Sequence, residues 1–465
     1  MPEHPAPTPS HAILAEALDA LALPAALAER LVVAGEGSLP SCFPVTDLAT
    51  AAIAAAGLAV SGLLSLDGPS SAVTVDRHLA SAWFIFSLRP QGWEMPNPWD
   101  PIAGDYRAAD GWIRLHTNAP HHRAAALAVL DCAGEREAVA SAVSRFAAGE
   151  LETAILSAGG CAAAMRDMAA WRVHAQGRAV RAEPLIALDR AAAPASSWRP
   201  DPARPLAGIR VLDLTRVLAG PIATRFLAGL GAEVLRIDPP GWEEPSIAPD
   251  VTPGKRCARL DLRQTADRRR FEALLAGADI LVHGYRPGAL DGLGYGPTER
   301  RRVNPGLIDV SLCAYGWTGP WAGRRGFDSL VQMSTGIAAA GMAWKGADRP
   351  VPLPVQALDH ATGYLIAASA IRGLAARLRE GLAVTARLSL TRTALALTEH
   401  SGASPGPDFA GRRDEDYAPE TELTAWGPAL RLSSPLRIGD TVLRWDRPAS
   451  ALGSAEASWS HARTA

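Results

Sequence analysis

Strand-like and helix-like segments alternate between residues 209 and 312, and this alternation constrains the fold more than any other feature of the sequence. The expected strands are 209–214, 233–237, 258–262, 280–283 and 307–312, and the expected helices are 222–230, 265–277 and about 298–303. Strands joined by helices form right-handed crossovers, which leave the strands parallel with helices on both faces of the sheet. The sequence therefore predicts an α/β fold with a doubly wound, mostly parallel sheet, whose ligands bind beyond the carboxyl ends of the strands.

A second, smaller α+β domain is expected on the N-terminal side of this sheet. Residues 104–115 are typical of two short strands around an Asp110–Gly111 turn, and helical patterns follow as far as His174. The segments expected along the chain are a helical segment with a partial repeat of a later helix (1–80), the small α+β domain (81–190), a Pro/Ala/Ser-rich linker (191–205), the large domain (206–395) and an irregular C-terminal tail (396–465).

Composition indicates an ordinary soluble protein, with 48% hydrophobic and 20% charged residues. The net charge of −2 favours neither nucleic acid nor an anionic membrane as a partner. Five scattered cysteines without a C-x-x-C pair indicate a reducing, cytoplasmic location and no metal site, and no signal peptide is expected. The uncharged stretch 48–66 is nearly long enough to span a bilayer, but its alanines, glycines and hydroxyl residues favour a buried helix.

Asp359 is the only acidic residue between Asp348 and Glu380, and it lies where a Pro-bounded loop passes into a helix rich in small residues. Asp is a favoured N-cap residue, so a purely structural capping role is one interpretation. A nucleophilic or acid/base carboxylate at a helix N-terminus is the other. Nothing in the neighbouring sequence decides between them.

An internal repeat connects this segment to the N-terminal part of the chain. Asp47 begins a small-residue helix and is followed after 26 residues by Val73, in a short strand pattern. Asp359 likewise begins such a helix and is followed after 25 residues by Val384. The first copy lacks the glycine that the second has at Gly363. A chance match among alanine-rich helices is the alternative explanation.

Several motifs of the large domain occur in the order of a known family. They are the segments 205–221 and 230–240, Gly254-Lys255-Arg256, Leu260-Asp-Leu262, Tyr285-Arg-Pro-Gly288, Asn304-Pro305, Gly316-x-x-Gly-Pro320, Gly326-Phe-Asp328 and Val331-Gln332. Over roughly 205–395 the sequence resembles the class III CoA-transferases, the family of formyl-CoA and carnitine CoA-transferases. The small domain is similar more weakly, and here it precedes the large domain that it normally follows.

The resemblance implies a Rossmann-like large domain and a covalent mechanism on an aspartate. In the family, an Asp at a helix start, followed four residues later by Gly, attacks an acyl-CoA thioester; Asp359 and Gly363 match this motif. An acyl-aspartyl anhydride and an aspartyl-CoA thioester follow, and an acceptor carboxylate takes the CoA. The helix N-terminus is expected to keep Asp359 ionised. Asp328 is expected to be a supporting acid near the reacting centre or to make a loop hydrogen bond.

The resemblance also assigns a CoA pocket and the partners. The residues expected to bind CoA are Arg216, Val217, Leu218, Ala219, Lys255, Arg256, Tyr285 and Arg286. For Arg216 and Arg286 the alternative is an ordinary surface charge. No cofactor is expected beyond CoA as substrate and product, since no G-x-G-x-x-G motif follows the first strand. The partners expected are an acyl-CoA and a small carboxylic acid, without nucleic acid or membrane, and the chain is expected to form a homodimer.

Two other functions remain open from the sequence. The α-methylacyl-CoA racemases resemble this chain too, but they carry a His where it has Phe327, and a phenyl ring transfers no proton. A catalytically degenerate CoA-binding protein is the second alternative, because the domains are rearranged and His283-Gly-Tyr285 replaces the Glu-Asn-Phe of many family members.

Overall fold

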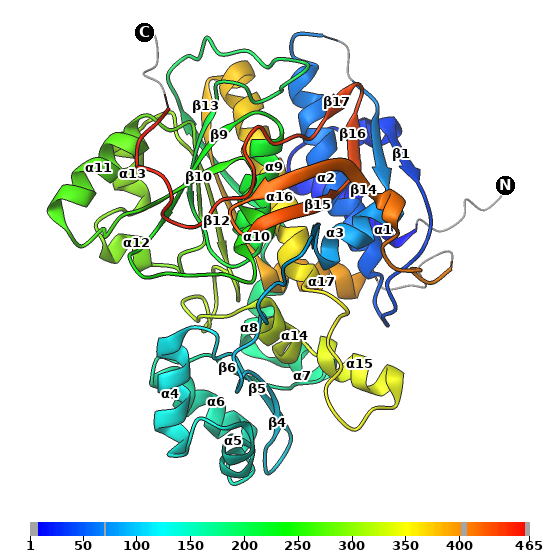
Figure 1. The fold of residues 1–465 in the computed structure, drawn as a ribbon, viewed down its shortest axis with the longest axis vertical. Coiled ribbons are helices and arrows are strands. Elements are labelled where there is room, and N and C mark those ends of the chain that lie inside the picture. Colours follow the sequence, from blue (N-terminus) through cyan, green and yellow to red (C-terminus); the bar gives the residue numbers. More distant parts are fainter. Residues whose placement is uncertain (1–7, 69–70, 401–406, 461–465) are drawn as a thin grey trace.

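The computed structural model describes residues 8–68, 71–400 and 407–460 (Figure 1). Its largest sheet has seven strands in the order β10-β9-β8-β11-β12-β13-β7. These are β7 (Ala187–Ala192), β8 (Arg210–Leu214), β9 (Glu233–Asp238), β10 (Lys255–Arg259), β11 (Ile280–His283), β12 (Ile308–Cys313) and β13 (Leu382–Ser389). Six strands are parallel and β7 is antiparallel to β13. The predicted α/β class with a doubly wound, mostly parallel sheet is confirmed.

The chain order reverses between β8 and β11, which are neighbours in the sheet. This point matters because ligands of doubly wound sheets bind beyond the carboxyl ends of the strands where the order reverses. The loops that begin after Leu214 and after His283 therefore face one crevice. One strand was placed wrongly from the sequence: β10 spans Lys255–Arg259 rather than 258–262.

Alternation along the strands separates two hydrophobic cores. On β8, Val211 packs in the larger core, which also contains the buried residues of α9 (Ala219–Gly229) and α16 (Ala357–Glu380). Leu212 belongs to the opposite core with α11 (Thr265–Ala276). Helices thus cover both faces of the sheet, and α9 and α16 pack against each other on the same face.

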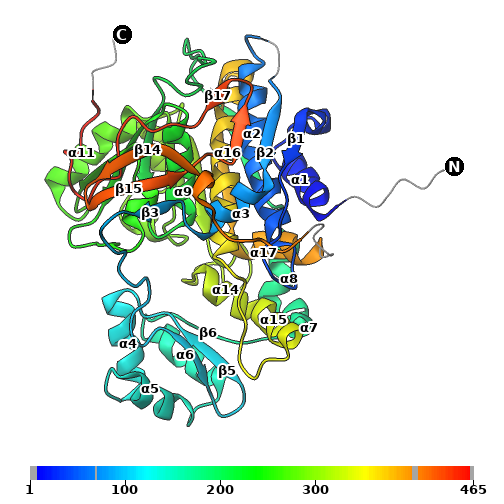
Figure 2. The ribbon, with the colours of Figure 1, turned by 45° about the vertical axis from the view of Figure 1, so that its right-hand side comes forward.

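The small domain has its own sheet and its own core. Its antiparallel sheet, in the order β4-β5-β6, is formed by β4 (Gly104–Arg107), β5 (Trp112–Leu115) and β6 (Ala162–Ala164). The helices of this domain are α4 (Pro120–Leu130), α5 (Arg136–Val143) and α6 (Ala148–Ser157). Figure 2 shows this domain below the large sheet, next to α14 (Asp328–Ser334), and an apolar cluster joins β6 to α14. The α+β character is as predicted.

The internal repeat is visible in the backbone. Helix α2 (Val45–Leu64), β2 (Val73–Asp76) and α3 (Arg77–Ile85) recur in order as α16, β13 and α17 (Leu390–Glu399). The residues before the two long helices have almost the same conformation, with φ −76° and ψ 66° at Pro44 and φ −75° and ψ 63° at Gln356. The two helices pack against each other, so the repeated units lie side by side.

Helix α2 is the one described helix that is long and apolar enough to cross a membrane. Of its most apolar 18-residue window, 89% is buried inside the protein. It lies against α1 (Pro9–Ala20), α3 and α16. This burial is that of a core helix, as the sequence indicated for the stretch 48–66.

The C-terminal segment differs from the irregular tail predicted for 396–465. Its described residues contain α17 and four strands, which are β14 (Tyr417–Thr424), β15 (Gly427–Leu432), β16 (Leu436–Ile438) and β17 (Thr441–Val442). β15 pairs with β3 (Leu88–Pro90), and β16 pairs with β2. These strand partners lie more than 300 residues earlier in the chain, so no local pattern reveals them. The expected segments 81–190 and 191–205 change for the same reason, because β3 and β7 belong to sheets outside the small domain.

The remaining described elements are short. They are η1 (Ala25–Arg30), β1 (Leu31–Ala34), α7 (Met168–Val173), α8 (Ala175–Arg181), α10 (Ala248–Val251), α12 (Ala289–Gly292), α13 (Pro297–Val303), α15 (Ile337–Lys345) and η2 (Asp414–Asp416).

Candidate active site

Asp359 and Asp328 meet at the N-terminus of α16. The Oδ2 atom of Asp328 accepts hydrogen bonds from the backbone N–H groups of Leu358 (2.9 Å) and Asp359 (3.0 Å). Asp328 therefore caps the helix from another element, and the interpretation of Asp359 as the N-cap is wrong. The Asp359 side chain is buried, at 8% exposure, and no hydrogen bond or ion pair joins its carboxylate to another residue of the described chain.

A glutamine fixes the orientation of the capping carboxylate. Gln332, one turn further along α14, donates from Nε2 to Asp328 Oδ1 at 2.5 Å. The Oε1 atom of the same amide accepts from the backbone N–H of Leu353 at 2.7 Å. Asp328 is thus held by three donors, whereas the carboxylate of Asp359 stays available to a ligand.

Both carboxyl groups bind a proton more tightly than usual. Burial, and then the neighbouring charge of Asp328, raises the pKa of Asp359 well above its ordinary value. Burial raises the pKa of Asp328 to about 6, although Gln332 and the two backbone donors oppose this rise. Two adjacent buried carboxylates resist double ionisation and share a proton. The expectation that the helix N-terminus keeps Asp359 ionised is therefore corrected, because Asp328 occupies the N–H donors of that terminus.

These raised pKa values predict how stability depends on pH. The folded pair binds protons more tightly than the unfolded chain, so its favourable contribution is complete below the ordinary carboxyl pKa of 3.8. The contribution is lost progressively as the pH rises from 3.8 through the folded pKa values, of which that of Asp328 is about 6. Asp359→Asn should therefore gain free energy of unfolding relative to the native protein between pH 4.5 and pH 7.5, as measured by urea denaturation. A difference that does not change with pH would contradict the shared proton.

Gly363 brings α9 onto the Asp359 face of α16. It lies one turn after Asp359, on the same side of the helix. A methyl group at Gly363 would lie 2.6 Å from the carbonyl oxygen of Ala219 and 3.0 Å from Cβ of Ile222. The missing side chain therefore allows the first turn of α9, and the loop before it, to approach the carboxylate pair.

We expect Gly363→Ala to lower the free energy of unfolding by about 1–3 kcal/mol, because the added methyl group overpacks the contact with α9. The matched control is Gly149→Ala in α6, where the added methyl group meets no atom within 4 Å and should be neutral or slightly stabilising. Equal effects of the two substitutions in denaturant titrations would show that the close approach of α9 is unimportant.

The loops after β8 and β11 meet at the point where the strand order reverses. Arg216, in the first loop, donates from Nη2 to the hydroxyl oxygen of Tyr285 in the second, at 2.9 Å. The Arg216 guanidinium also lies 5.0 Å from the ring centre of Trp242. Arg286 is exposed beside Tyr285. The structure thus brings Arg216 and Tyr285 together, although they are separated by 69 residues in the sequence.

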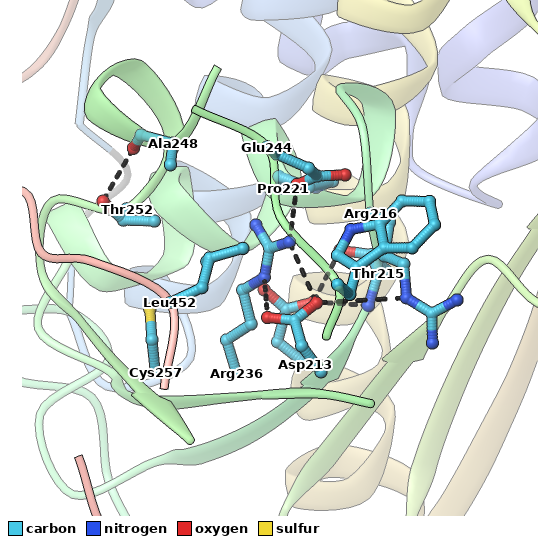
Figure 3. A network of polar contacts seen from close by, with 12 residues as sticks. Asp213, Thr215, Arg216, Pro221, Arg236, Glu244, Ala248, Thr252, Cys257 and Leu452 are labelled. Atoms are coloured by element: carbon cyan, nitrogen blue, oxygen red, sulfur yellow. Dashed lines mark hydrogen bonds and ion pairs between the residues drawn. The ribbon is translucent and has the colours of Figure 1, made fainter. Parts of the chain in front are cut away.

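A buried charge network holds the first loop in an uncommon conformation (Figure 3). Val217 has a φ of 66°, which non-glycine residues rarely adopt, and its N–H donates to Glu244 Oε1 at 2.6 Å. The other oxygen of Glu244 accepts from Arg236 at 2.6 Å. Thr215, at the start of the loop, donates to Asp213 at 2.5 Å. A strained backbone conformation persists only where surrounding contacts hold it in place, and such residues are common at ligand sites. Leu218 and Ala219 then begin α9.

Lys255 and Arg256 do not reach this crevice, which corrects their assignment to the phosphates or adenine of CoA. The Lys255 ammonium group is buried and donates to Asp213 (3.1 Å), to the Pro221 carbonyl (2.9 Å) and to Thr224 (2.6 Å). It therefore joins α9 to β8. Arg256 donates to the carbonyl of Ser458 at 2.5 Å. Both residues lie on β10, the edge strand of the sheet, and the C-terminal segment contacts Arg256.

The repeated aspartate has a different environment in the first copy. Asp47 is fully buried, and both of its carboxylate oxygens accept from the Arg77 guanidinium at 3.0 Å. A carboxylate neutralised by a bidentate arginine serves structure rather than chemistry. The restriction of the catalytic prediction to Asp359 is consistent with this difference.

Sequence reasoning missed the contribution of the small domain to this site. The ring of His116 stacks on Phe327, the residue before Asp328, with ring centres 3.7 Å apart and planes 3° apart. Arg114, on β5, is close enough for its positive charge to oppose the raised pKa of Asp328. Neither residue belongs to a motif near Asp328, so only the packing of the two domains reveals them.

Comparison with known proteins is consistent with this geometry. Residues 206–421 match the CoA-transferase family III model. A probable fatty acyl-CoA transferase, Rv3272 of Mycobacterium tuberculosis, is 33% identical over 211 residues, or 42% of this chain and 53% of the relative. Mouse succinyl-CoA:glutarate CoA-transferase is 34% identical over 194 residues, or 39% and 44% of the two chains. Acetyl-CoA:oxalate CoA-transferase of Acetobacter aceti is 36% identical over 151 residues, or 30% and 39%.

Two solved structures were also found as partial matches. The crystal structure of Rv3272 matches with 33% identity and a TM-score of 0.40, covering 43% of this chain and 58% of that one. A CAIB/BAIF family protein from Brucella suis matches with 25% identity and a TM-score of 0.38, covering 50% and 67%. The chain thus spans about half, or less, of the length of the curated relatives described above.

Proposed function

We propose that this chain, whose residues 206–421 match the CoA-transferase family III model, transfers CoA from an acyl-CoA donor to a carboxylic acid, with Asp359 as the covalent nucleophile. The observation that carries the proposal is the Asp359 carboxylate itself. It is buried, its backbone is fixed by Asp328, and no group of the described residues is bonded to it. Once it has lost its proton, this carboxylate is free of hydrogen bonds to the described residues and is available to attack a thioester.

The donor half of the reaction begins when a carboxylate oxygen of Asp359 attacks the thioester carbonyl. The carbon–sulfur bond breaks, and CoA leaves as a thiolate from an acyl-aspartyl anhydride. The thiolate then attacks the aspartyl carbonyl and releases the donor acid as its carboxylate. Each step exchanges one acyl bond for another, so two easier steps replace one difficult exchange.

The acceptor half repeats these steps with a second acid. Its carboxylate attacks the aspartyl-CoA thioester, forms a new anhydride and expels the thiolate, which then takes the acceptor acyl group and restores Asp359. Asp359 must lose its proton before the first attack, because burial and the neighbouring charge of Asp328 raise its pKa. The cap that Asp328 forms also holds the backbone of Asp359 through both halves.

Arg216, Tyr285 and Arg286 support the binding of CoA at the crevice after β8 and β11. The loop from Arg216 to Ala219 leads directly into α9. Because Gly363 has no side chain, α9 packs closely against the part of α16 that carries Asp359. A CoA molecule held by these loops would direct its thioester towards α16. No cofactor other than CoA takes part in the proposed steps, and a homodimer in the cytoplasm remains our expectation for the assembly and its location.

Trapping with hydroxylamine tests the nucleophile. Incubation with an acyl-CoA should leave a hydroxamate on Asp359, because hydroxylamine attacks the activated aspartyl carbonyl, and peptide mass spectrometry should locate it there. The label should require the acyl-CoA and be absent from Asp359→Asn. Turnover of acyl-CoA without any label at Asp359 would rule out this mechanism, and CoA binding without acyl exchange would favour a binding protein.

A further inference from the structure

Three side chains of the small domain form a continuous layer against the carboxylate site. The layer consists of Trp99, Arg114 and His116, and His116 stacks on Phe327 as described above. The rings of Trp99 and His116 meet edge to face, with centres 6.0 Å apart. The Arg114 guanidinium lies 5.1 Å from the ring centre of Trp99. The small domain therefore presents one cation and one imidazole beside Phe327.

This layer is next to the reacting group rather than remote from it. β5 packs on α14, whose first residue is Asp328, and Asp328 caps the helix turn that carries Asp359. Arg114 and His116 are two positions apart along an extended segment, so they share one face. The positive charge of Arg114 also acts on Asp328. The face that contacts Phe327 therefore lies beside the residue that precedes Asp328.

The hydrogen-bond donors of this layer are incompletely used by the protein. Arg114 donates from Nη1 to Asp105 Oδ1 at 2.8 Å, while its Nε is buried without a partner and its Nη2 bonds no residue of the described chain. The Nε–Nη2 edge is one of the edges with which arginine binds a carboxylate through two parallel hydrogen bonds. His116 is 6% exposed, and its buried Nδ1 has no partner. An unpaired buried donor is costly and requires an explanation.

The chemistry of these groups selects an anion. Burial, with His122 and Arg114 nearby, lowers the pKa of His116 to about 3, so the ring is neutral at physiological pH and carries one N–H. A guanidinium edge and an imidazole N–H are both donors, and a carboxylate is an acceptor of matching charge and shape. An acid that approaches Asp359 and Asp328 also needs a cation to offset the repulsion between negative charges.

We propose that the Nε–Nη2 edge of Arg114 and the ring N–H of His116 bind the carboxylate of the acceptor acid beside Asp359. This inference rests on the proposed function and assigns its acceptor subsite to the small domain, whereas the loops of the large domain hold CoA. In the step served by this subsite, an acceptor oxygen bonds to the aspartyl carbonyl carbon, the carbon–sulfur bond breaks, and CoA leaves as thiolate. No proton is transferred, which is consistent with a neutral imidazole that acts only as a donor.

The test separates the two halves of the reaction. Arg114→Gln should raise the KM for the acceptor acid about 10- to 100-fold, the range expected for a lost charged hydrogen bond, and should leave the KM for the acyl-CoA donor within about 2-fold. Arg114→Lys should recover part of the loss, because it restores charge but not the two-bond edge. His116→Asn should raise the acceptor KM by a smaller factor. Hydroxamate formation at Asp359 from the donor alone should persist in all three variants.

The control is Arg107→Gln, an exposed arginine on β4 of the same sheet, which should change neither KM. An unchanged acceptor KM in Arg114→Gln, or an equal rise in both KM values, would overturn the inference. If Arg114→Gln does not fold, the KM values of Arg114→Lys and His116→Asn for acceptor and donor test the inference in the same way. Failure of the proposed function looks different, because the native protein itself would then form no hydroxamate at Asp359.

Discussion

Asp359→Asn is expected to reduce the turnover of an acyl-CoA with a carboxylic acid by at least about 10³-fold, because an amide cannot form the anhydride on which both halves depend. Within the described residues the Asp359 carboxylate has no bonding partner, and the substitution removes the cost of ionising the buried pair, so the fold should survive. CD spectra should therefore match those of the native protein and the melting temperature should be at least as high, while chromatography of the CoA products shows the loss of turnover.

The internal repeat supplies a matched control for this result. Asp47→Asn places the same substitution at the equivalent helix position of the first copy, where the carboxylate is bonded to Arg77. This variant should lose stability and keep its turnover per folded molecule. If Asp47→Asn abolished turnover and Asp359→Asn did not, the two copies would have been assigned the wrong way round.

Arg77→Met is expected to lower the free energy of unfolding by about 3–5 kcal/mol, since it removes the cation that neutralises a fully buried carboxylate. Arg77 also donates to Ser38 at 3.0 Å, so the substitution breaks a contact between α3 and the segment before α2. Urea denaturation of the native and substituted proteins measures the difference.

Two further variants separate the buried charge from a general loss of packing. Arg77→Met combined with Asp47→Asn removes both charges and should recover more than half of the lost free energy. Arg302→Met breaks an exposed ion pair with Glu299 on α13 and should cost less than about 1 kcal/mol. A double variant as unstable as Arg77→Met alone would show that the cation is not what matters.

The large domain was predictable because its information is local. Strands such as 210–214 and 280–283 are short, mostly apolar segments, and segments with a helical pattern separate them. Because strand–helix–strand connections are right-handed, recognising these segments is enough to predict a parallel sheet. The tail was mispredicted because β15 and β16 are defined by pairing with β3 and β2, and the sequence does not show which distant strands will pair.

The site was predictable in part for a similar reason. Asp359, Gly363 and the Arg216 loop have recognisable neighbours in the sequence, and the structure brings them to one face of α16. Lys255 was misassigned because it forms a buried ion pair with Asp213, which lies 42 residues away in the sequence. Arg114 and His116 were missed because they come from another domain.

What the sequence determined by itself is which residues have the functional groups for covalent chemistry, and the strand and helix periods that place them at the ends of elements. Only the tertiary structure decided that Asp328 rather than Asp359 caps α16, that Asp359 pairs with no cation of the described residues while Asp47 has Arg77, and that burial beside Asp328 raises the pKa of Asp359. The physical reason is that secondary structure follows from neighbouring residues, whereas charge, hydration and hydrogen bonding in a buried site depend on groups that meet only when the whole chain has folded.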